Sequence, residues 1–211
     1  MVAELKRASP SAGRIAEREA GAQVRAYEAA GAVAVSVLTE PRHFGGALAD
    51  LRAVRMAVPL PILRKDFVVH PSQLIQSRAE GADAVLLIAA AVSEAELAAL
   101  VQAAADLGLG ALVETHTEQD LRKALAAGAR IVGVNARDLE SLEVDGERAL
   151  RLLREVPSDR TTVLESGIST RGHVLRAVEA GASAVLVGEA LMRAADPEAK
   201  LRELLGVGDG S

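Results

Sequence analysis

Helix-like and strand-like stretches alternate along the chain, and the junctions between them repeat one pattern. An alanine-rich stretch ends in glycine, and a run of β-branched and other apolar residues follows at once. Glycine at a helix end adopts the left-handed conformation without a Cβ penalty, and a continuously apolar run is typical of a strand buried on both faces. The pattern occurs at residues 30–33, 80–85, 108–113, 127–132 and 180–185. It predicts helices that each lead into a buried parallel strand.

Strands that lack this junction bring the expected set to eight. They are expected near Val2–Lys6, Val33–Thr39, Pro61–Phe67, Ala84–Ala90, Gly110–His116, Arg130–Arg137, Thr161–Gly167 and Ser183–Glu189. The repeat of roughly 25 residues is what one strand, one helix and two short loops require. An open doubly wound sheet usually has fewer strands and a G-x-G-x-x-G turn after the first, whereas residues 9–13 here read SPSAG. The pattern predicts an α/β fold, a single (β/α)8 TIM barrel over residues 1–205, with a flexible tail at 206–211.

Composition narrows the class of function. The 211 residues carry a net charge of −5 without a basic tract, so nucleic-acid binding has little electrostatic support. No apolar run is long enough for a membrane helix, and Glu4 would interrupt the apolar part of any signal peptide, so we expect a cytoplasmic protein. The chain has no cysteine, and its four histidines lack metal-ligand spacing, so we expect neither a disulfide nor a metal site.

Charged and amide side chains stand at the ends of six predicted strands, where barrels of this kind place their active sites. They are Glu4 with Lys6, Lys65, Glu114, Asn135 with Arg137, Glu165 with Ser166, and Glu189. Side chains two apart on a strand share a face, so Glu4 and Lys6 should point the same way. Each charge could merely solvate a strand end. Because buried charges cost several kcal/mol unless they are paired, so many of them favour one shared site.

Two of the three aromatic residues fall on this same face of the predicted barrel. Phe44 follows the second strand and Phe67 ends the third, while Tyr27 is mid-helix, where packing explains it. The two phenylalanines could form a small hydrophobic cap. We favour a slot for a planar apolar group of a substrate.

Turns after the last two predicted strands indicate a phosphate site. Ser166-Gly167-Ile168-Ser169 and Gly188-Glu189 can present main-chain N–H groups at the place where this fold often binds phosphate. Lys6 can supply a positive charge beside them. We therefore expect a small phosphorylated molecule as the binding partner.

Seven sequence motifs are highly specific when they occur together, although each alone would not identify a family. They are Ala3–Ser11, Val37–Pro41, Leu63–Phe67, Leu112–His116, Val134–Leu139, Glu165–Ile168 and Gly188–Arg193. Through them nearly the whole chain resembles the indole-3-glycerol phosphate synthase family of tryptophan biosynthesis. The resemblance implies a carbon–carbon lyase that closes the indole ring of 1-(2-carboxyphenylamino)-1-deoxyribulose 5-phosphate, releasing carbon dioxide and water. It also implies a cytoplasmic enzyme that needs no metal or organic cofactor, and we expect a monomer.

Matched motif by motif, the resemblance implies a role for each candidate residue. Lys65 matches the general acid, and Glu114 matches a second acid–base carboxylate that we expect to protonate the hydroxyl lost as water. The other expected catalytic residues are Glu4, Asn135, Glu165 and Ser166. The expected substrate-binding residues are Lys6, Ser9, Phe44, Phe67, Arg137, Gly167, Leu186, Gly188 and Glu189. Among these, Phe44 and Phe67 would hold the anthranilate ring, and Lys6 and the glycines the phosphate.

Two departures from the family pattern bear on this expectation. Family members carry an extension before the first strand, whereas this sequence starts at that strand, so we expect weaker closure over the substrate and lower stability. Ala136 stands where the family usually has a polar residue. By alternation along the strand its side chain should point outward, so we expect little effect on catalysis. The alternative function is a truncated or redesigned barrel scaffold that binds phosphate ligands with little or no catalysis. A sister barrel, phosphoribosylanthranilate isomerase, is disfavoured because its acid–base pair includes a cysteine.

Overall fold

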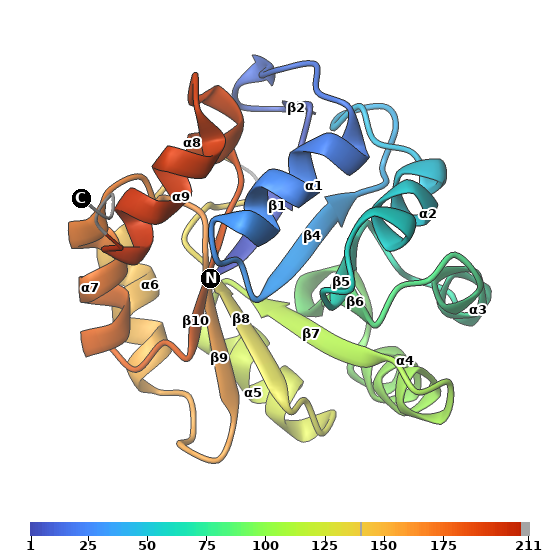
Figure 1. Ribbon diagram of the computed structural model, residues 1–211. Coiled ribbons are helices and arrows are strands. Elements are labelled where there is room, and N and C mark those ends of the chain that lie inside the picture. The colour runs from blue at the N-terminus through green and yellow to red at the C-terminus, as the bar shows by residue number, and fades with distance from the viewer. Residues whose placement is uncertain (140, 208–211) are drawn as a thin grey trace.

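The computed structural model describes residues 1–139 and 141–207, and the centre of this part of the chain is a closed barrel of parallel strands. The barrel strands are β1 (Val2–Leu5), β4 (Ala34–Leu38), β5 (Ile62–Lys65), β6 (Ala84–Ile88), β7 (Gly110–Thr115), β8 (Ile131–Asn135), β9 (Thr161–Glu165) and β10 (Ala184–Val187). Each pairs with the next barrel strand along the chain, and β10 closes the ring on β1, where Val2 lies opposite Leu186. The predicted (β/α)8 barrel is confirmed (Figure 1).

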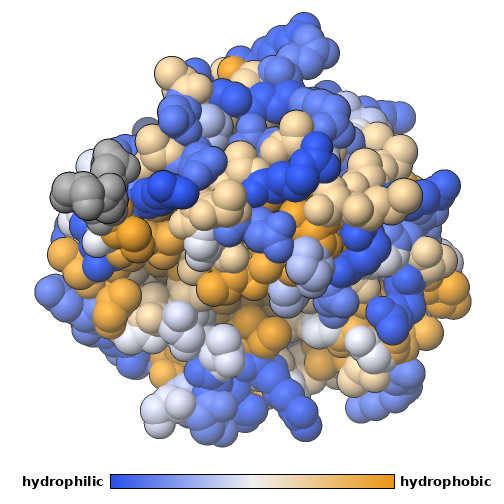
Figure 2. All heavy atoms as spheres, viewed as in Figure 1, coloured by the Kyte–Doolittle hydropathy of each residue, from blue (hydrophilic) through white to orange (hydrophobic). Residues whose placement is uncertain are grey.

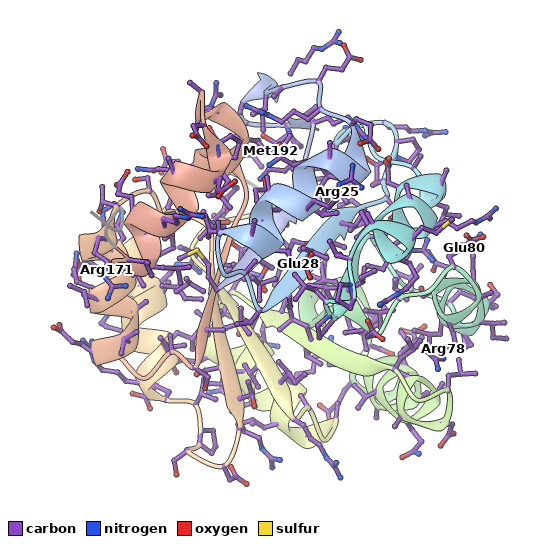
Figure 3. All side chains as sticks on the ribbon, viewed as in Figure 1. Arg25, Glu28, Arg78, Glu80, Arg171 and Met192 are labelled. Atoms are coloured by element: carbon purple, nitrogen blue, oxygen red, sulfur yellow. The ribbon has the colours of Figure 1, made fainter. Side chains whose placement is uncertain are left out.

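Helices form an outer ring around these strands (Figure 1). They are α1 (Ala20–Ala29), α2 (Leu48–Ala57), α3 (Pro71–Ala79), α4 (Glu94–Asp106), α5 (Glu118–Ala126), α6 (Gly146–Arg154), α7 (Arg171–Glu179), α8 (Glu189–Arg193) and α9 (Pro197–Leu205), and the 3-10 turn η1 (Ala89–Ala91) follows β6. Polar side chains such as Arg25 on α1 and Arg78 on α3 project away from the barrel (Figure 3). Hydrophilic residues accordingly cover much of the face seen in Figure 2, with apolar residues near its middle.

The helix-to-strand junctions have the geometry that the repeated glycine predicts. Gly31, which follows α1, has a φ of 95°, and Gly128, which follows α5, has a φ of 81°. At the first junction the N–H of Gly31 donates to Glu28 O at 2.9 Å, and that of Ala32 donates to Tyr27 O at 3.0 Å. These bonds satisfy carbonyl groups at the helix end and turn the chain towards β4.

Two apolar shells hold the barrel together. The inner shell fills the barrel below its mouth with Leu63, Leu86, Ile88, Leu112, Val163 and Leu186. The outer shell lies between strands and helices and includes Val85, Leu87 and Ala136, so the last of these faces outward as expected. Along β6, alternate residues thus enter different shells, and both shells are apolar, which explains the continuously apolar run. Burying each large side chain contributes roughly 1.5–3 kcal/mol.

Several strands end earlier than expected. Lys6, Phe67, His116, Arg137, Gly167 and Glu189 lie just beyond their strands rather than inside them. The reason is that polar and aromatic residues at the carboxyl ends leave the hydrogen-bonded ladder and enter the loops at the barrel mouth. The strands themselves were therefore found in the sequence, although their expected boundaries were one or two residues too long.

Two local elements were not expected. β2 (Ala8–Ser9) and β3 (Gly13–Arg14) form a short antiparallel hairpin between β1 and α1, and α8 precedes α9. Strands of two residues carry no periodic signal, so no pattern could have indicated the hairpin. Of the expected tail, Gly206 caps α9 with a φ of 71°, and the N–H of Val207 donates to Arg202 O at 3.0 Å. Residues 208–211 lie outside the described residues.

Candidate active site

A cavity of about 570 Å³ opens at the carboxyl ends of the barrel strands. Every site residue chosen from the sequence lines it, namely Glu4, Lys6, Ser9, Phe44, Lys65, Phe67, Glu114, Asn135, Arg137, Glu165, Ser166, Gly167, Leu186, Gly188 and Glu189. Leu86 and Ile88 of the inner apolar shell also line it. This convergence favours one shared site over separate charges that each solvate a strand end.

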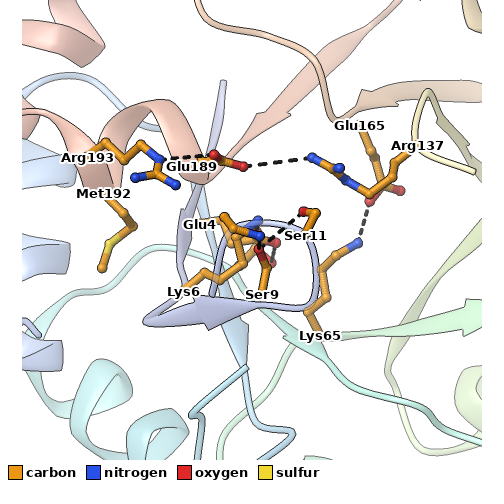
Figure 4. A network of polar contacts seen from close by, with 12 residues as sticks. Glu4, Lys6, Ser9, Ser11, Lys65, Arg137, Glu165, Glu189, Met192 and Arg193 are labelled. Carbon is orange, nitrogen blue, oxygen red and sulfur yellow. Dashed lines mark hydrogen bonds and ion pairs between the residues drawn. The ribbon is translucent and has the colours of Figure 1, made fainter. Parts of the chain in front are cut away.

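Lys65, the last residue of β5, lies between two carboxylates. Its Nζ is 3.1 Å from Glu114 Oε2 at the end of β7, and it also donates to Glu165 Oε2 at the end of β9 (Figure 4). The side chain of Lys65 is 15% exposed, and those of the two glutamates are 3% and 2% exposed. Buried charges are tolerated when they are paired, so the three strands together hold an ammonium and two carboxyl groups in fixed contact.

Burial and pairing move the pKa values of these groups in different directions. Burial alone would lower the pKa of Lys65, but Glu165 and Glu114 raise it above its ordinary value. Burial alone would raise the pKa of Glu114, but Lys65 and then His116 hold it well below its usual range. Burial raises the pKa of Glu165 to about 7, even though Lys65 acts in the opposite direction. Glu114 is therefore the ionised carboxylate of the free site, and Glu165 is the one that can hold a proton near neutral pH.

A glycine on the neighbouring strand makes room for Glu165. The Oε1 atom of Glu165 is buried without a hydrogen-bond partner among residues 1–139 and 141–207. This oxygen lies against Gly133 of β8, where an added Cβ would stand 2.3 Å from it. Any larger residue at this position would push the carboxylate away from Lys65. An unpaired buried oxygen also favours the protonated form of Glu165.

Glu4 and Lys6 form a second buried pair on the β1 side of the cavity. Lys6 Nζ is 3.2 Å from Glu4 Oε1, and Ser36 Oγ on β4 donates to Glu4 Oε2 at 3.1 Å. Gly188 leaves space for this carboxylate, since a Cβ there would be 2.4 Å from Glu4 Oε1. Tyr27 packs in the core as expected, and its hydroxyl donates to the main-chain oxygen of Glu4 at 3.2 Å. The two side chains on this strand end share one face, as predicted.

The two phenylalanines meet on the wall of the cavity. The ring centroids of Phe44 and Phe67 are 6.3 Å apart, with the ring planes tilted by 50°. The loop that carries Phe44 folds around the Glu40 carboxylate, which accepts hydrogen bonds from the N–H groups of Arg42 at 2.9 Å, His43 at 2.6 Å and Phe44 at 3.3 Å. An aromatic wall held in this way can receive a planar ring edge-on or offset.

The loops after β9 and β10 bring main-chain groups to the cavity, and Arg137, which follows β8, adds a cation to its lining. Ser166 has a φ of 67°, a left-handed conformation that costs a non-glycine residue about 1–3 kcal/mol, and Gly167 follows with a φ of 74°. Arg137 Nη2 is 3.8 Å from Glu189 Oε2, and Arg193 Nε donates to Glu189 Oε1 at 3.0 Å (Figure 4). Strained turns beside cations are suited to an anion such as a phosphate group.

The β2–β3 hairpin contributes the remaining polar group. Ser9 Oγ lies 3.4 Å from Ser11 Oγ and accepts a hydrogen bond from Ala12 N at 3.2 Å (Figure 4). Ser9, Pro10 and Ser11 all line the cavity. The hairpin thus brings a short polar segment to the rim of the site.

Four contributors to the site were missed in the sequence. Glu40 and His43 follow β4, His116 follows β7, and Gly133 lies within β8. The first three stand at strand ends, so their position could have selected them. Gly133 carries the signal of a glycine inside an apolar strand, which often marks a close approach of another group.

Residues 1–139 and 141–207 contain no group of three or more His, Asp or Glu side chains that could hold a metal ion. Within the same ranges, no helix has both the length and the apolar character needed to cross a membrane.

Sequence comparisons agree on one family. A family model described as indole-3-glycerol phosphate synthase matches residues 1–204. The indole-3-glycerol phosphate synthase of Micrococcus luteus is 53% identical over 203 residues, covering 96% of this chain and 76% of its own length. That of a Nocardioides species is 52% identical over 208 residues, covering 98% and 80%. That of Mycobacterium avium is 49% identical over 209 residues, covering 99% and 77%.

Solved structures that superpose on this chain have low sequence identity to it, so they show a shared fold and nothing more. 3-Hexulose-6-phosphate synthase from Salmonella typhimurium superposes with a TM-score of 0.79 at 18% identity, covering 97% of this chain and 96% of that one. A mutant tryptophan synthase alpha-subunit from Pyrococcus furiosus superposes with a TM-score of 0.74 at 18% identity, covering 97% of each chain.

Proposed function

The chain belongs to the indole-3-glycerol phosphate synthase family, whose members are carboxy-lyases of tryptophan biosynthesis, and we propose how its own residues carry out that reaction. The substrate is 1-(2-carboxyphenylamino)-1-deoxyribulose 5-phosphate, and the products are indole-3-glycerol phosphate, carbon dioxide and water. One observation supports the assignment of roles most strongly. Lys65 is held between an ionised Glu114 and a protonatable Glu165, inside a cavity that also has an aromatic wall and an anion-binding rim.

Ring closure comes first. The aromatic carbon that carries the carboxylate attacks the ketone carbon, and Lys65 donates a proton to the alkoxide that develops. Loss of carbon dioxide then restores the aromatic ring. The ammonium of Lys65 is suited to this step because the two carboxyl groups fix its position and leave its remaining proton for the substrate.

Dehydration follows and needs a proton donor and a proton acceptor. Because the pKa of Glu165 is raised to about 7 while that of Glu114 is held low, we assign the proton that leaves with the hydroxyl to Glu165. Glu114 accepts the proton released from the C1′ methylene as the indole double bond forms. This assignment differs from the one expected from the sequence, in which Glu114 was the acid that protonates the leaving hydroxyl. Here Glu165 is that acid and Glu114 is the base.

The proton balance closes around Lys65. Glu114, now protonated, lies 3.1 Å from Lys65 Nζ and returns a proton to it. Glu165 recovers its proton from solvent, so each turnover consumes one proton. That is the number required when a carboxylate leaves as neutral carbon dioxide. Because the groups are in contact, they titrate as one coupled cluster.

The rest of the cavity binds and orients the substrate. The anthranilate ring packs against Phe44 and Phe67, and the phosphate binds at the rim formed by Lys6 and the turns at Gly167 and Gly188. Ser9 and Arg137 complete this rim, and Asn135 stands beside the reacting carbons. Leu186 contributes apolar surface below them.

Turnover of the purified chain tests this proposal. The protein is mixed with the carboxyphenylamino-deoxyribulose phosphate, and indole-3-glycerol phosphate is followed by its fluorescence. We expect saturable turnover without added metal or cofactor. Binding of substrate without any turnover would overturn the proposal and would favour a phosphate-binding scaffold.

We also propose that residues 1–205 act as one domain, as a monomer in the cytoplasm with no nucleic-acid partner. The support is that one chain supplies every group named in the site and that the net charge is −5. Light scattering on the purified protein in the assay buffer checks the monomer.

A further inference from the structure

One buried side chain touches the reactive cluster and has no role in the mechanism above. His116 follows β7, two residues after Glu114, and only 5% of it is exposed. Its Nε2 is 3.3 Å from Glu114 Oε1, the oxygen that Lys65 does not contact. The Glu114 carboxylate is therefore approached at both oxygens, by an ammonium on one side and an imidazole on the other.

The imidazole has no competing partner among residues 1–139 and 141–207. Both ring nitrogens are buried and neither has a hydrogen-bond partner within these ranges, so the contact of the ring with Glu114 is the ion-pair distance from Nε2 to its carboxylate. Buried polar nitrogens nearly always have a partner, and a buried nitrogen without one is costly. An ionised carboxylate only accepts hydrogen bonds, so the contact requires the proton of the ring to be on Nε2.

The main chain of His116 is held from two helices. Its N–H donates to Asp120 Oδ2 on α5 at 3.1 Å, and its carbonyl accepts a hydrogen bond from Arg148 Nη1 on α6. The same guanidinium donates through Nη2 to the carbonyls of Asn135 and Ala136, each at 3.2 Å. Arg148 thus ties the end of β7 to the end of β8. The main chain at His116 is thus fixed at the point from which its ring reaches Glu114.

The two carboxylates on Lys65 differ in this respect. Glu165 has a free Oε1 beside Gly133, whereas Glu114 has the imidazole at its Oε1. A donor at the second oxygen favours the ionised form and prevents rotation of the carboxylate. This difference separates a proton acceptor from a neighbouring proton donor.

We propose that His116 is a positioning residue for Glu114: its Nε2 orients the carboxylate as the proton acceptor for the dehydration step, and Arg148 holds the main chain that carries the imidazole. The inference rests on the proposed function of the same site. The charged groups next to His116 are Glu114 on β7 at its ring, and Asp120 on α5 and Arg148 on α6 at its main chain, with Lys65 on the far side of the Glu114 carboxylate.

Two substitutions at His116 separate positioning from packing. His116→Leu fills the space without a donor, and His116→Gln can present an amide N–H near the place of Nε2. We expect kcat of the leucine variant to fall about 10- to 100-fold with little change in KM, because the polar group next to the second oxygen of the charged carboxylate is lost. The acid limb of its kcat–pH profile should move to higher pH, since Glu114 loses a group that keeps it ionised. The glutamine variant should recover part of kcat.

A matched histidine serves as the control. His70 caps α3 through its ring, which accepts a hydrogen bond from Ser72 N at 3.2 Å, and it does not line the cavity. His70→Gln should leave kcat and the pH profile unchanged. If His116→Leu keeps the kcat and the acid limb of the parent protein, the inference is overturned.

A measurement without turnover separates this inference from the proposed function. In protein labelled with ¹⁵N on histidine, the ring signals of His116 should shift in Glu114→Gln, while those of His70 and His173 should stay in place. Unmoved His116 signals would contradict the contact even in an active enzyme. If the His116 signals shift but the protein shows no turnover, the contact between His116 and Glu114 is upheld and only the proposed enzymatic function is contradicted. The same spectra decide the matter if the leucine variant fails to fold.

Discussion

Two lysines share the mouth of this barrel, and their surroundings give them different chemistry. Lys65 and Lys6 are almost equally exposed, at 15% and 16% of their side chains. Lys65 contacts two carboxyl groups that are themselves buried, whereas Lys6 pairs with the carboxylate of Glu4 and lies near turns of main chain. The first arrangement is suited to moving a proton between fixed groups, and the second to holding a phosphate. Residue type and burial are the same, so the partners decide the role.

The largest effect on kcat is expected when Lys65, the lysine proposed to transfer a proton, is removed. Lys65→Ala should lower kcat about 10³- to 10⁴-fold, because a positioned general acid contributes up to this much. KM should change far less, since the phosphate and ring contacts remain. Steady-state kinetics by indole fluorescence measures both values.

Lys200→Ala is the matched control for that change, because Lys200 lies on α9, away from the cavity, and pairs with the exposed Glu203. It should leave kcat unaltered. A kcat within tenfold of the parent for Lys65→Ala would remove the distinction between the two lysines.

The next effect tests the carboxylate beside Lys65 without touching a charged residue. Gly133→Ala would place a Cβ 2.3 Å from Glu165 Oε1. We expect kcat to fall about 10²-fold, since a displacement of about 1 Å in a reacting group can cost that much, and stability to fall by about 1–3 kcal/mol. Gly146→Ala is the control, because a Cβ there meets nothing within 4 Å. Equal kinetics for both variants would show that the position of Glu165 does not matter.

On the other side of the mouth, Lys6→Ala should act on binding. We expect KM to rise about 10- to 100-fold with a smaller change in kcat, because one charge-assisted contact to the phosphate is lost. Added inorganic phosphate should inhibit the parent protein more strongly than the variant. An unchanged KM would mean that Lys6 does not bind the phosphate.

The smallest effect concerns stability and pH. Burial raises the pKa of Glu165 from the ordinary 4.5 to about 7 in the folded chain, so the folded state binds more protons than the unfolded state between these values. Its contribution is fully present below 4.5 and is lost as pH rises through about 7. Glu165→Gln removes this contribution, so the free energy of unfolding of the parent should fall relative to the variant over that range.

Urea unfolding at several pH values measures the difference, with Glu203→Gln on the surface of α9 as the control. A constant difference between parent and Glu165→Gln across the range would show that the pKa of Glu165 is not raised.

Much of the fold was visible in the chain because the barrel repeats one local rule. Glycine after a helix and an apolar run after the glycine are local features, and Gly31 and Gly128 adopt the conformation that this rule requires. The charged side chains that line the cavity could also be picked out, since a charge at the end of an apolar strand is unusual. The hairpin at Ala8–Arg14 was not visible, because its two-residue strands depend on contacts with the rim rather than on periodicity.

By itself, the sequence determined the number of strands, the barrel and the set of side chains at its mouth, because each follows from spacing along a regular repeat. Only the tertiary structure decided which charges meet. It placed Lys65 between Glu114 and Glu165, set an imidazole against one carboxylate and a glycine against the other, and so gave the two glutamates different pKa values. The physical reason is that a pKa depends on burial and on groups within a few ångströms, which here come from four strands far apart in the chain.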